Sequence, residues 1–291
     1  MKLTDGGIET VLIFDEGIEL PCFAAFDLLR TAEGTETLRA YFEPYLELAR
    51  DHRLPFVLCA PTWRSSPDWG AKLGYSAEEL AAANRRAVEL MHEIRAANRD
   101  LELTVDAVIG PRGDGYVAGA EMSPEQAEAY HAVQIGALTG ADTLTALTLT
   151  YAGEAIGIVR AARRLELPVA ISFTVETDGR LPSGQPLRDA IEQTDAEAAP
   201  DYYMVNCAHP EHFAAVLDGD WAQRIRGIRA NASRKSHAEL DEAETLDTGD
   251  PADLAARYAK LRAKLPELEL VGGCCGTDHR HIEAIAEAFR G

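Results

Sequence analysis

The chain has 291 residues, of which 46% are hydrophobic and 26% charged, and its formal net charge at pH 7 is −20. This composition is typical of a globular protein with one large core, and no apolar stretch is long enough to span a bilayer. The acidic balance disfavours phosphate backbones and anionic membranes, so we expect neither nucleic acid nor a membrane as a partner.

Cysteine usage and the first residues bear on the compartment. Five cysteines in a chain of this length do not indicate a disulfide framework. Residues 1–10 show neither a signal-peptide nor a transit-peptide pattern. The sequence therefore predicts a cytoplasmic protein whose thiols are reduced or bound to metal.

Short apolar runs rich in β-forming residues alternate with longer segments of helical spacing. In chain order the runs cover residues 6–13, 55–60, 102–110, 142–149, 168–175, 201–207, 225–230 and 268–274. Helix starts lie between them at Ser76, at Ser123-Pro124 and at Asp250-Pro251. Eight such units without a linker predict an α/β fold, a single-domain TIM (β/α)8 barrel over residues 1–291.

Long loops follow several of the predicted strands. The segments 61–75 and 110–122 are extended, and the segment 230–250 is longer still without clear periodicity. In a barrel, the loops that follow strands gather at the C-terminal face, where active sites lie, and extended loops are usually functional or disordered. We therefore predict that residues 231–249 form a long loop or lid over that face.

Three cysteines fall at the ends of the sixth and eighth runs: Cys207, and the adjacent Cys274 and Cys275. Strands six and eight are second neighbours in a closed barrel, so the three sulfurs are expected at one rim. Three soft ligands that leave one position open are the arrangement of a catalytic zinc site. The predicted cofactor is Zn²⁺, and these cysteines are its predicted ligands and the predicted catalytic residues.

Other interpretations of these thiols stay open. A free cysteine is most often a small buried hydrophobic residue, as we expect for Cys59 and Cys22. The GGCCG segment could instead bind phosphate through its backbone, or the adjacent cysteines could form a vicinal disulfide, which a reducing cytoplasm disfavours. The nearby histidines are expected to cap helices or lie on the surface rather than to bind metal: His209, His279 and His281.

Five motifs occur in a fixed order: DGGIET at 5–10, IGPRGDGY at 109–116, SFTVETDGRLPSGQPLRDAI at 172–191, VNC at 205–207 and GGCCGTDHRHI at 272–282. Over essentially the full length, this set resembles the homocysteine S-methyltransferases. The resemblance implies a TIM barrel with zinc held by three cysteines, at the positions of Cys207, Cys274 and Cys275. It also implies that a methyl group moves from a cationic onium donor to a thiol acceptor such as homocysteine. The donor would be S-methylmethionine, S-adenosylmethionine or a betaine.

The resemblance also suggests substrate contacts. Asp5 matches the aspartate with which the family touches its substrate, and aromatic residues near the rim could hold a cationic donor by cation-π contact. Those aromatic residues are Trp63, Trp69, Tyr116 and Tyr151. The predicted substrate-binding residues are Asp5, Thr62, Trp63, Asn206 and Glu176.

Two departures from the family pattern concern the acceptor. The amine-binding glutamate of strand four falls at Leu147, and the Thr-Asn-Thr after strand two reads Ala60-Pro61-Thr62. An apolar residue cannot pair with a buried ammonium group. Either Glu176 or another carboxylate replaces that glutamate, or the acceptor is a different thiol or selenol. A noncatalytic zinc-thiolate or redox-sensing protein is a third hypothesis, and the sequence is compatible with a homo-oligomer.

Overall fold

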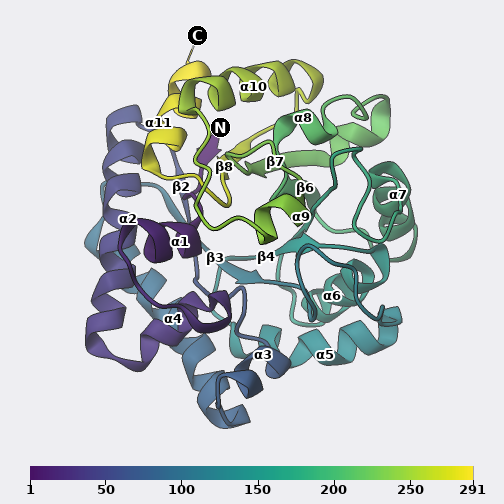
Figure 1. Ribbon diagram of the computed structural model, residues 1–291. Helices are drawn as coiled ribbons and strands as arrows, with labels where there is room; N and C mark the ends of the chain where they lie inside the picture. The colour runs from purple at the N-terminus through teal and green to yellow at the C-terminus, as the bar shows by residue number, and fades with distance from the viewer. Residues whose placement is uncertain (291) are drawn as a thin grey trace.

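Eight parallel strands close into a barrel in chain order, β1 to β8, in a computed structural model that describes residues 1–290. Figure 1 shows the ring of helices around them. The strands are β1 (Lys2–Leu3), β2 (Phe56–Cys59), β3 (Leu103–Ile109), β4 (Thr143–Leu149), β5 (Val169–Phe173), β6 (Tyr202–Asn206), β7 (Ile225–Ala230) and β8 (Leu270–Gly273). The TIM barrel predicted from the sequence is confirmed.

Helices follow the strands and cover the outside of the barrel. The α-helices are α1 (Ile8–Thr10), α2 (Ala32–His52), α3 (Pro67–Lys72), α4 (Ala77–Ala97), α5 (Pro124–Ala137), α6 (Ala152–Arg164), α7 (Leu187–Ala198), α8 (Pro210–Phe213), α9 (His237–Asp241), α10 (Pro251–Lys264) and α11 (His279–Ala288). A π-helical turn and three 3₁₀ turns add η1 (Val11–Asp15), η2 (Pro21–Phe23), η3 (Ala25–Arg30) and η4 (Asp220–Arg224).

The predicted helix starts are confirmed by their caps. Ser76 and Ser123 each form a capping box with the residue three positions on, and Asp250 accepts hydrogen bonds from the first turn of α10. Within residues 1–290, no helix combines the length and the apolar character that crossing a lipid bilayer would require.

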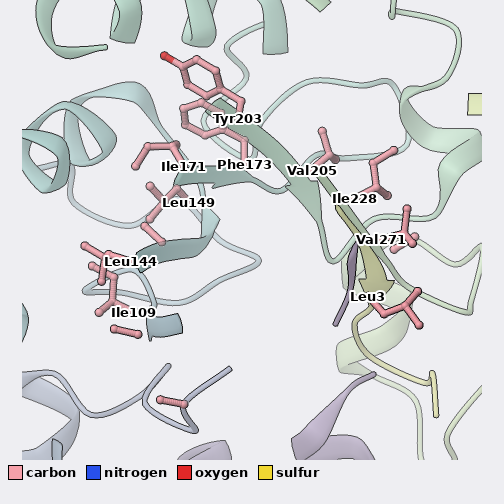
Figure 2. Packing of buried hydrophobic residues seen from close by; sticks show 14 of the residues in the cluster. Leu3, Ile109, Leu144, Leu149, Ile171, Phe173, Tyr203, Val205, Ile228 and Val271 are labelled. Carbon is pink, nitrogen blue, oxygen red and sulfur yellow. The ribbon is translucent and has the colours of Figure 1, made fainter. Parts of the chain in front are cut away.

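The barrel wall separates two apolar layers, because successive strand residues point to opposite sides. On β5 and β6, Ile171, Phe173 and Tyr203 face the helices, and Figure 2 shows them in that outer layer. Ala170 and Met204, their neighbours in sequence, belong to the cluster inside the barrel. Strands buried on both sides read as nearly continuous apolar runs, which explains why the sequence located seven of them.

The first predicted strand, residues 6–13, is wrong. The structure places β1 at Lys2–Leu3, and the run itself forms α1 and the start of η1. A short apolar run cannot be told from a buried helical turn by periodicity, and a strand of two residues has no periodicity to detect. The consequence for the site is that residues 6–10 lie beyond the end of β1, on the C-terminal face.

An irregularity in β4 changes which side chains face the barrel interior. The pairing of β4 with β5 shifts register between Ala146 and Leu149, and Thr148 adopts a left-handed conformation with φ of 64°. The Thr148 backbone N–H donates to the Oδ1 atom of Asn206 over 2.8 Å. As a result, the consecutive residues Leu147 and Thr148 both line the cavity at the barrel mouth.

The segment 231–249 crosses the C-terminal face and includes the short helix α9, as Figure 1 shows. Its ends are tied to the barrel: the Ala232 N–H donates to the Cys275 carbonyl over 3.1 Å, and His281 Nε2 contacts the Thr248 carbonyl at 2.8 Å. A lid function for this segment remains a prediction.

Candidate functional site

Three cysteine sulfurs lie together at the C-terminal face of the barrel. Cys207 follows β6, and Cys274 and Cys275 follow β8. Only β7 lies between these two strands in the barrel, so the three cysteines are close together at its C-terminal face. Their Sγ atoms all lie within 4.8 Å of one another. Cys207 and Cys274 are paired as a disulfide with Cα atoms 5.4 Å apart, and the Sγ of Cys275 is 3.9 Å from that of Cys207. The structure thus brings the three predicted ligands to one point.

The backbone of Cys207 is held in a conformation that non-glycine residues rarely adopt, with φ of 53°. Its carbonyl oxygen contacts His237 Nε2 at 2.8 Å and accepts a hydrogen bond from Asn231 Nδ2 at 3.0 Å. Strained residues of this kind persist where surrounding contacts over-determine them, and they concentrate at functional sites. These contacts fix the direction in which the Cys207 sulfur points.

The two glycines before the adjacent cysteines allow β8 to end in tight packing. A Cβ atom on Gly272 would overlap the side chain of Thr4, and one on Gly273 that of Thr277, so only glycine fits. The Cys274 N–H then donates to the Ala230 carbonyl over 2.9 Å, which extends the pairing with β7 by one residue. Beyond this point the chain turns, and both the Cys274 and Cys275 sulfurs reach the same cavity.

A cavity of about 330 Å³ opens from the sulfurs to the C-terminal face. Its inner part is apolar, with Val108 and Leu147 among the lining residues, and the aromatic side chains of Trp63, Trp69 and Tyr116 line it as well. This combination of apolar walls with a few polar groups is typical of a small-molecule site.

Asp5 lines the cavity, but its carboxylate is already engaged by the protein. Arg229 donates to its Oδ1 atom over 2.8 Å, and the Tyr41 hydroxyl donates to its Oδ2 atom over 3.0 Å. All three side chains are buried. A substrate amino group that binds Asp5, as predicted, would therefore compete with the Arg229 guanidinium for the same carboxylate.

Asn206 and Trp63, two of the predicted substrate-binding residues, also line the cavity. The Asn206 amide is fully committed within the wall: its Oδ1 accepts from Ser172 and from the Thr148 N–H, and its Nδ2 donates to the Thr148 hydroxyl over 2.8 Å. The same Nδ2 lies 3.8 Å from the Cys274 sulfur. Asn206 thus connects the irregular part of β4, at Thr148, with the cysteine cluster.

Two predicted substrate contacts, Thr62 and Glu176, lie outside the set of residues that line the cavity. The Thr62 side chain is completely buried, and its hydroxyl donates to the Val108 carbonyl over 2.6 Å. Glu176 contacts His237 Nδ1 at 2.9 Å, which places it behind the residue that holds the Cys207 carbonyl. The structure therefore gives both residues supporting positions, and their direct contact with a substrate stays a prediction.

The aromatic side chains predicted to hold a cationic donor divide into two groups. The Arg64 guanidinium carbon lies 3.9 Å from the ring centres of both Trp63 and Trp69, so these indoles already bind a cation of the protein. Tyr116 stacks on the His237 ring with centroids 4.0 Å apart and directs its hydroxyl to the Cys275 sulfur at 3.5 Å. Tyr151 is not among the lining residues; its hydroxyl accepts from the Met122 N–H.

Two of the three histidines considered in the sequence cap helices, as predicted. His209 caps α8 by accepting from the Glu211 N–H, and His281 completes the capping box of α11 with Asp278. Within residues 1–290, the only group of three or more potential metal-ligating side chains is that of the three cysteines, so no histidine joins it.

Five charged residues that line the cavity were missed as site residues in the sequence: Glu9, Arg64, Asp114, Arg229 and Asp241. The sequence did contain an indication of Arg229. It lies two residues after Gly227 in a predicted strand, so both point to the same side, toward the barrel interior, where a buried charge needs a partner. Glu9 was hidden by the assignment of residues 6–13 to a strand. Arg64 gave no signal apart from the two nearby tryptophans.

The cysteine cluster fits a soft metal ion by its donor set. It offers three sulfurs to one point beside a cavity and leaves room for a fourth ligand. Burial raises the pKa of the Cys275 thiol, so without a cation that group favours its protonated form. A metal ion would occupy the site only when the Cys207–Cys274 pair is reduced.

Comparison with known protein sequences gives a consistent result. The family model described as homocysteine S-methyltransferase matches residues 2–289. The homocysteine S-methyltransferase YbgG of Bacillus subtilis (strain 168) is 26% identical over 241 residues, which are 73% of this chain and 74% of that protein. The homocysteine S-methyltransferase 4 of Zea mays is 24% identical over 285 residues, 89% of this chain and 81% of that protein.

Among solved structures, the homocysteine methyltransferase MmuM from Escherichia coli has the same fold. Its oxidised form superimposes with a TM-score of 0.78 at 22% identity and covers 100% of this chain and 96% of that one. Its metallated form gives a TM-score of 0.74 at 22% identity, with 99% and 96% covered.

Proposed function

Because the chain belongs to the homocysteine S-methyltransferase family, we propose that it transfers a methyl group from a cationic onium donor to the thiol of a small acceptor such as homocysteine. The protein is a methyltransferase by its family. The observation that supports the particular reaction is the convergence of three sulfurs beside a cavity large enough for small substrates.

Cys207, Cys274 and Cys275 would hold a zinc ion as thiolates. When bound, zinc supplies a Lewis-acidic position at which an acceptor thiol loses its proton near neutral pH. Three thiolates and one divalent cation sum to a charge near minus one, which keeps an acceptor sulfur electron-rich. The Tyr116 hydroxyl, 3.5 Å from the Cys275 sulfur, supplies a hydrogen bond at the same point.

The remaining residues of the cavity would position the two substrates. Methyl transfer forms a bond from the acceptor sulfur to the methyl carbon as the bond from that carbon to the donor heteroatom breaks, and the donor leaves as a neutral thioether or amine. The apolar walls exclude water from the space between the two substrates. Holding the acceptor sulfur in line with the donor methyl group accelerates the reaction. Four carboxylates and two arginines line the cavity, and this negative balance favours a cationic donor: the carboxylates are Asp5, Glu9, Asp114 and Asp241, and the arginines are Arg64 and Arg229.

The test combines metal content with product mass. The reduced wild-type protein should bind one zinc per chain and methylate a thiol from a panel of sulfonium and methylated-amine donors. Cys207→Ser and Cys275→Ser should lose both properties. Cys22→Ser is the matched control for zinc content, because Cys22 is an exposed cysteine outside the cluster and its loss should leave zinc binding unchanged. Full turnover in Cys275→Ser would refute the proposal.

A thiol or selenol without an amino group is the second candidate acceptor. The observation that favours it is the apolar Leu147, which lines the cavity where the family has an amine-binding glutamate. Comparing the methylation of homocysteine with that of 4-mercaptobutanoate separates the two candidates, since these thiols differ only by the amino group.

A further inference from the structure

We infer that Glu9 and Arg64 hold the zwitterionic α-amino acid group of a substrate, with Glu9 pairing with its ammonium and Arg64 with its carboxylate. This inference rests on the proposed methyl transfer, because it assigns two residues of the same cavity to the charged end of a substrate. Both residues line that cavity, and they come from the loops that follow β1 and β2.

Glu9 carries the carboxylate that has no partner cation. It is half-buried in α1, and within residues 1–290 no other residue donates a hydrogen bond to its carboxyl and no ion pair joins it to a basic side chain. Burial raises the pKa of Glu9 to about 7, against the opposing effect of its own backbone N–H. A partner cation would remove this cost, and an ammonium group in the cavity is such a cation.

The other carboxylates that line the cavity are committed or exposed. Asp5 is paired with Arg229 and Tyr41. Asp114 accepts from the backbone N–H groups of residues 116 and 117 and lies 3.9 Å from Arg64, and Asp241 is exposed. Glu9 therefore combines partial burial with a free carboxyl in a way that none of the others does.

Arg64 is a buried guanidinium fixed in orientation, with a relative exposure of 7%. It lies 3.9 Å from the ring centres of both Trp63 and Trp69, and its Nη1 donates to the Gly113 carbonyl over 2.9 Å. Its Nη2 makes no hydrogen bond within the described residues, and the nearest carboxylate oxygen, Oδ2 of Asp114, is 3.9 Å away. A planar guanidinium that is pre-oriented and retains unused donors is suited to binding a carboxylate.

Glu9 and Arg64 affect each other electrostatically without forming an ion pair. Each lies near enough to favour the charged form of the other, yet no ion pair between them exists among residues 1–290. An α-amino acid carries its ammonium and carboxylate on one carbon and can therefore bridge two opposite charges that face one cavity. Leu147 is consistent with this assignment, because the carboxylate missing from β4 is supplied from the loop after β1.

Binding measurements on ligands that differ by one charged group test the assignment. The ligands are L-methionine, 4-(methylthio)butanoate, which lacks the ammonium, and 3-(methylthio)propylamine, which lacks the carboxylate. Calorimetry on the reduced, zinc-loaded wild type should show methionine binding at least about tenfold more tightly than either analogue, as expected for hydrogen bonds between charged groups. Equal binding of methionine and the butanoate would overturn the inference.

The variants assign each preference to one side chain. Glu9→Gln keeps the shape and should abolish the preference for methionine over the butanoate while it preserves the preference over the amine. Arg64→Gln should do the reverse, and Arg64→Lys, which keeps the charge, should retain part of the carboxylate preference. Glu19→Gln, an exposed carboxylate close in sequence, is the matched control and should change nothing. Melting temperatures verify that each variant is folded.

Turnover then identifies which substrate carries the amino acid group. If it belongs to the acceptor, Glu9→Gln should lower kcat/KM for homocysteine and not for 4-mercaptobutanoate. If it belongs to the donor, the same variant should lower kcat/KM for S-methylmethionine and not for trimethylsulfonium. Discrimination in binding without methyl transfer from any donor would refute the proposed function and leave this inference standing. Methyl transfer with wild-type discrimination in Glu9→Gln would refute the inference alone.

Discussion

Arg229 and Asp5 form an ion pair of 2.8 Å inside the barrel, and the two side chains are only 7% and 2% exposed. The same guanidinium donates through its Nε to the Gly273 carbonyl over 3.0 Å and through Nη2 to the Gly6 carbonyl over 3.0 Å. One arginine on β7 therefore connects the loop after β1 with the end of β8. A buried pair of this kind is costly to break from one side, because the remaining charge loses its partner.

Arg229→Met should lower the free energy of unfolding by about 3–5 kcal/mol, since it leaves the Asp5 carboxylate buried without a cation. Urea denaturation measures the change. The double variant Asp5→Asn, Arg229→Met removes both charges and should recover a substantial part of the loss. A double variant as unstable as the sum of the two single variants would show that the charges are not coupled.

Asp106 gives the stability of the protein a defined pH dependence. Burial inside the barrel raises the pKa of Asp106 to about 6, although hydrogen bonds from Thr143 and Thr145 oppose the effect. A carboxyl whose folded pKa exceeds its unfolded value of about 3.9 contributes stability below the unfolded pKa and loses it as pH rises through the folded pKa.

Asp106→Asn should therefore become more stable relative to wild type as pH rises from about 4.5 to 8, by an amount on the order of 2–3 kcal/mol. The amide keeps an oxygen to accept from Thr143 and cannot ionise. Unfolding free energies measured across this range give the difference curve. Asp220→Asn, at an exposed position, should follow the wild-type curve, and a flat difference for Asp106→Asn would contradict the assignment.

His237 links the segment 231–249 to the cysteine cluster through the Cys207 carbonyl, at 2.8 Å. Outer contacts of this kind orient metal ligands, and their loss typically costs 10- to 100-fold in metal affinity. His237→Ala should weaken zinc binding of the reduced protein by about that factor, as measured by competition with a chelator.

Glu176→Gln should weaken zinc binding less than His237→Ala does, because Glu176 acts on the cluster only through the His237 ring. His92→Ala, on the outer helix α4, is the control and should bind zinc as the wild type does. If His237→Ala bound zinc with the same affinity as the wild type, His237 would contribute to the fold and not to the orientation of the cysteine ligands.

Gly276 adopts φ of 77°, and a Cβ atom there would lie 2.6 Å from the Asp247 carbonyl oxygen. Gly276→Ala should lower the free energy of unfolding by about 1–3 kcal/mol through backbone strain, with an added steric cost. Gly113→Ala is the matched control, because a Cβ atom at that glycine meets nothing within 4 Å. Thermal melting of both variants checks the prediction, which would be wrong if their melting temperatures fell equally.

The cysteine cluster was predictable because its signal is carried by topology. Cys207 and Cys274 each end an apolar run, and a closed parallel barrel brings the ends of its strands to one face. The side-chain contacts of Thr62 and Glu176 were not predictable in the same way, because a motif gives the position of a residue and not the direction of its side chain. Thr62 turns to the Val108 carbonyl, and Glu176 turns to His237.

Charged residues of the cavity were hard to predict for a different reason. Arg229 and Glu9 lie in or next to apolar runs, where a lone charge gives no indication of its partner. The partner of Arg229 is Asp5, which is 224 positions away in sequence. Only the closed fold brings such pairs together, so the electrostatics of the cavity follow from tertiary structure and not from local pattern.

β1 contributes only Lys2 and Leu3, yet it pairs with β2 on one side and with β8 on the other. The Gly276 N–H also donates to the Thr10 hydroxyl over 3.1 Å, between residues 266 positions apart. Contacts of such sequence separation form late, since a long stretch of chain must be ordered before they are gained. The cavity is complete only when β1 has paired with β8 and the barrel is closed. The time at which substrate binding appears during refolding would therefore report when the barrel closes.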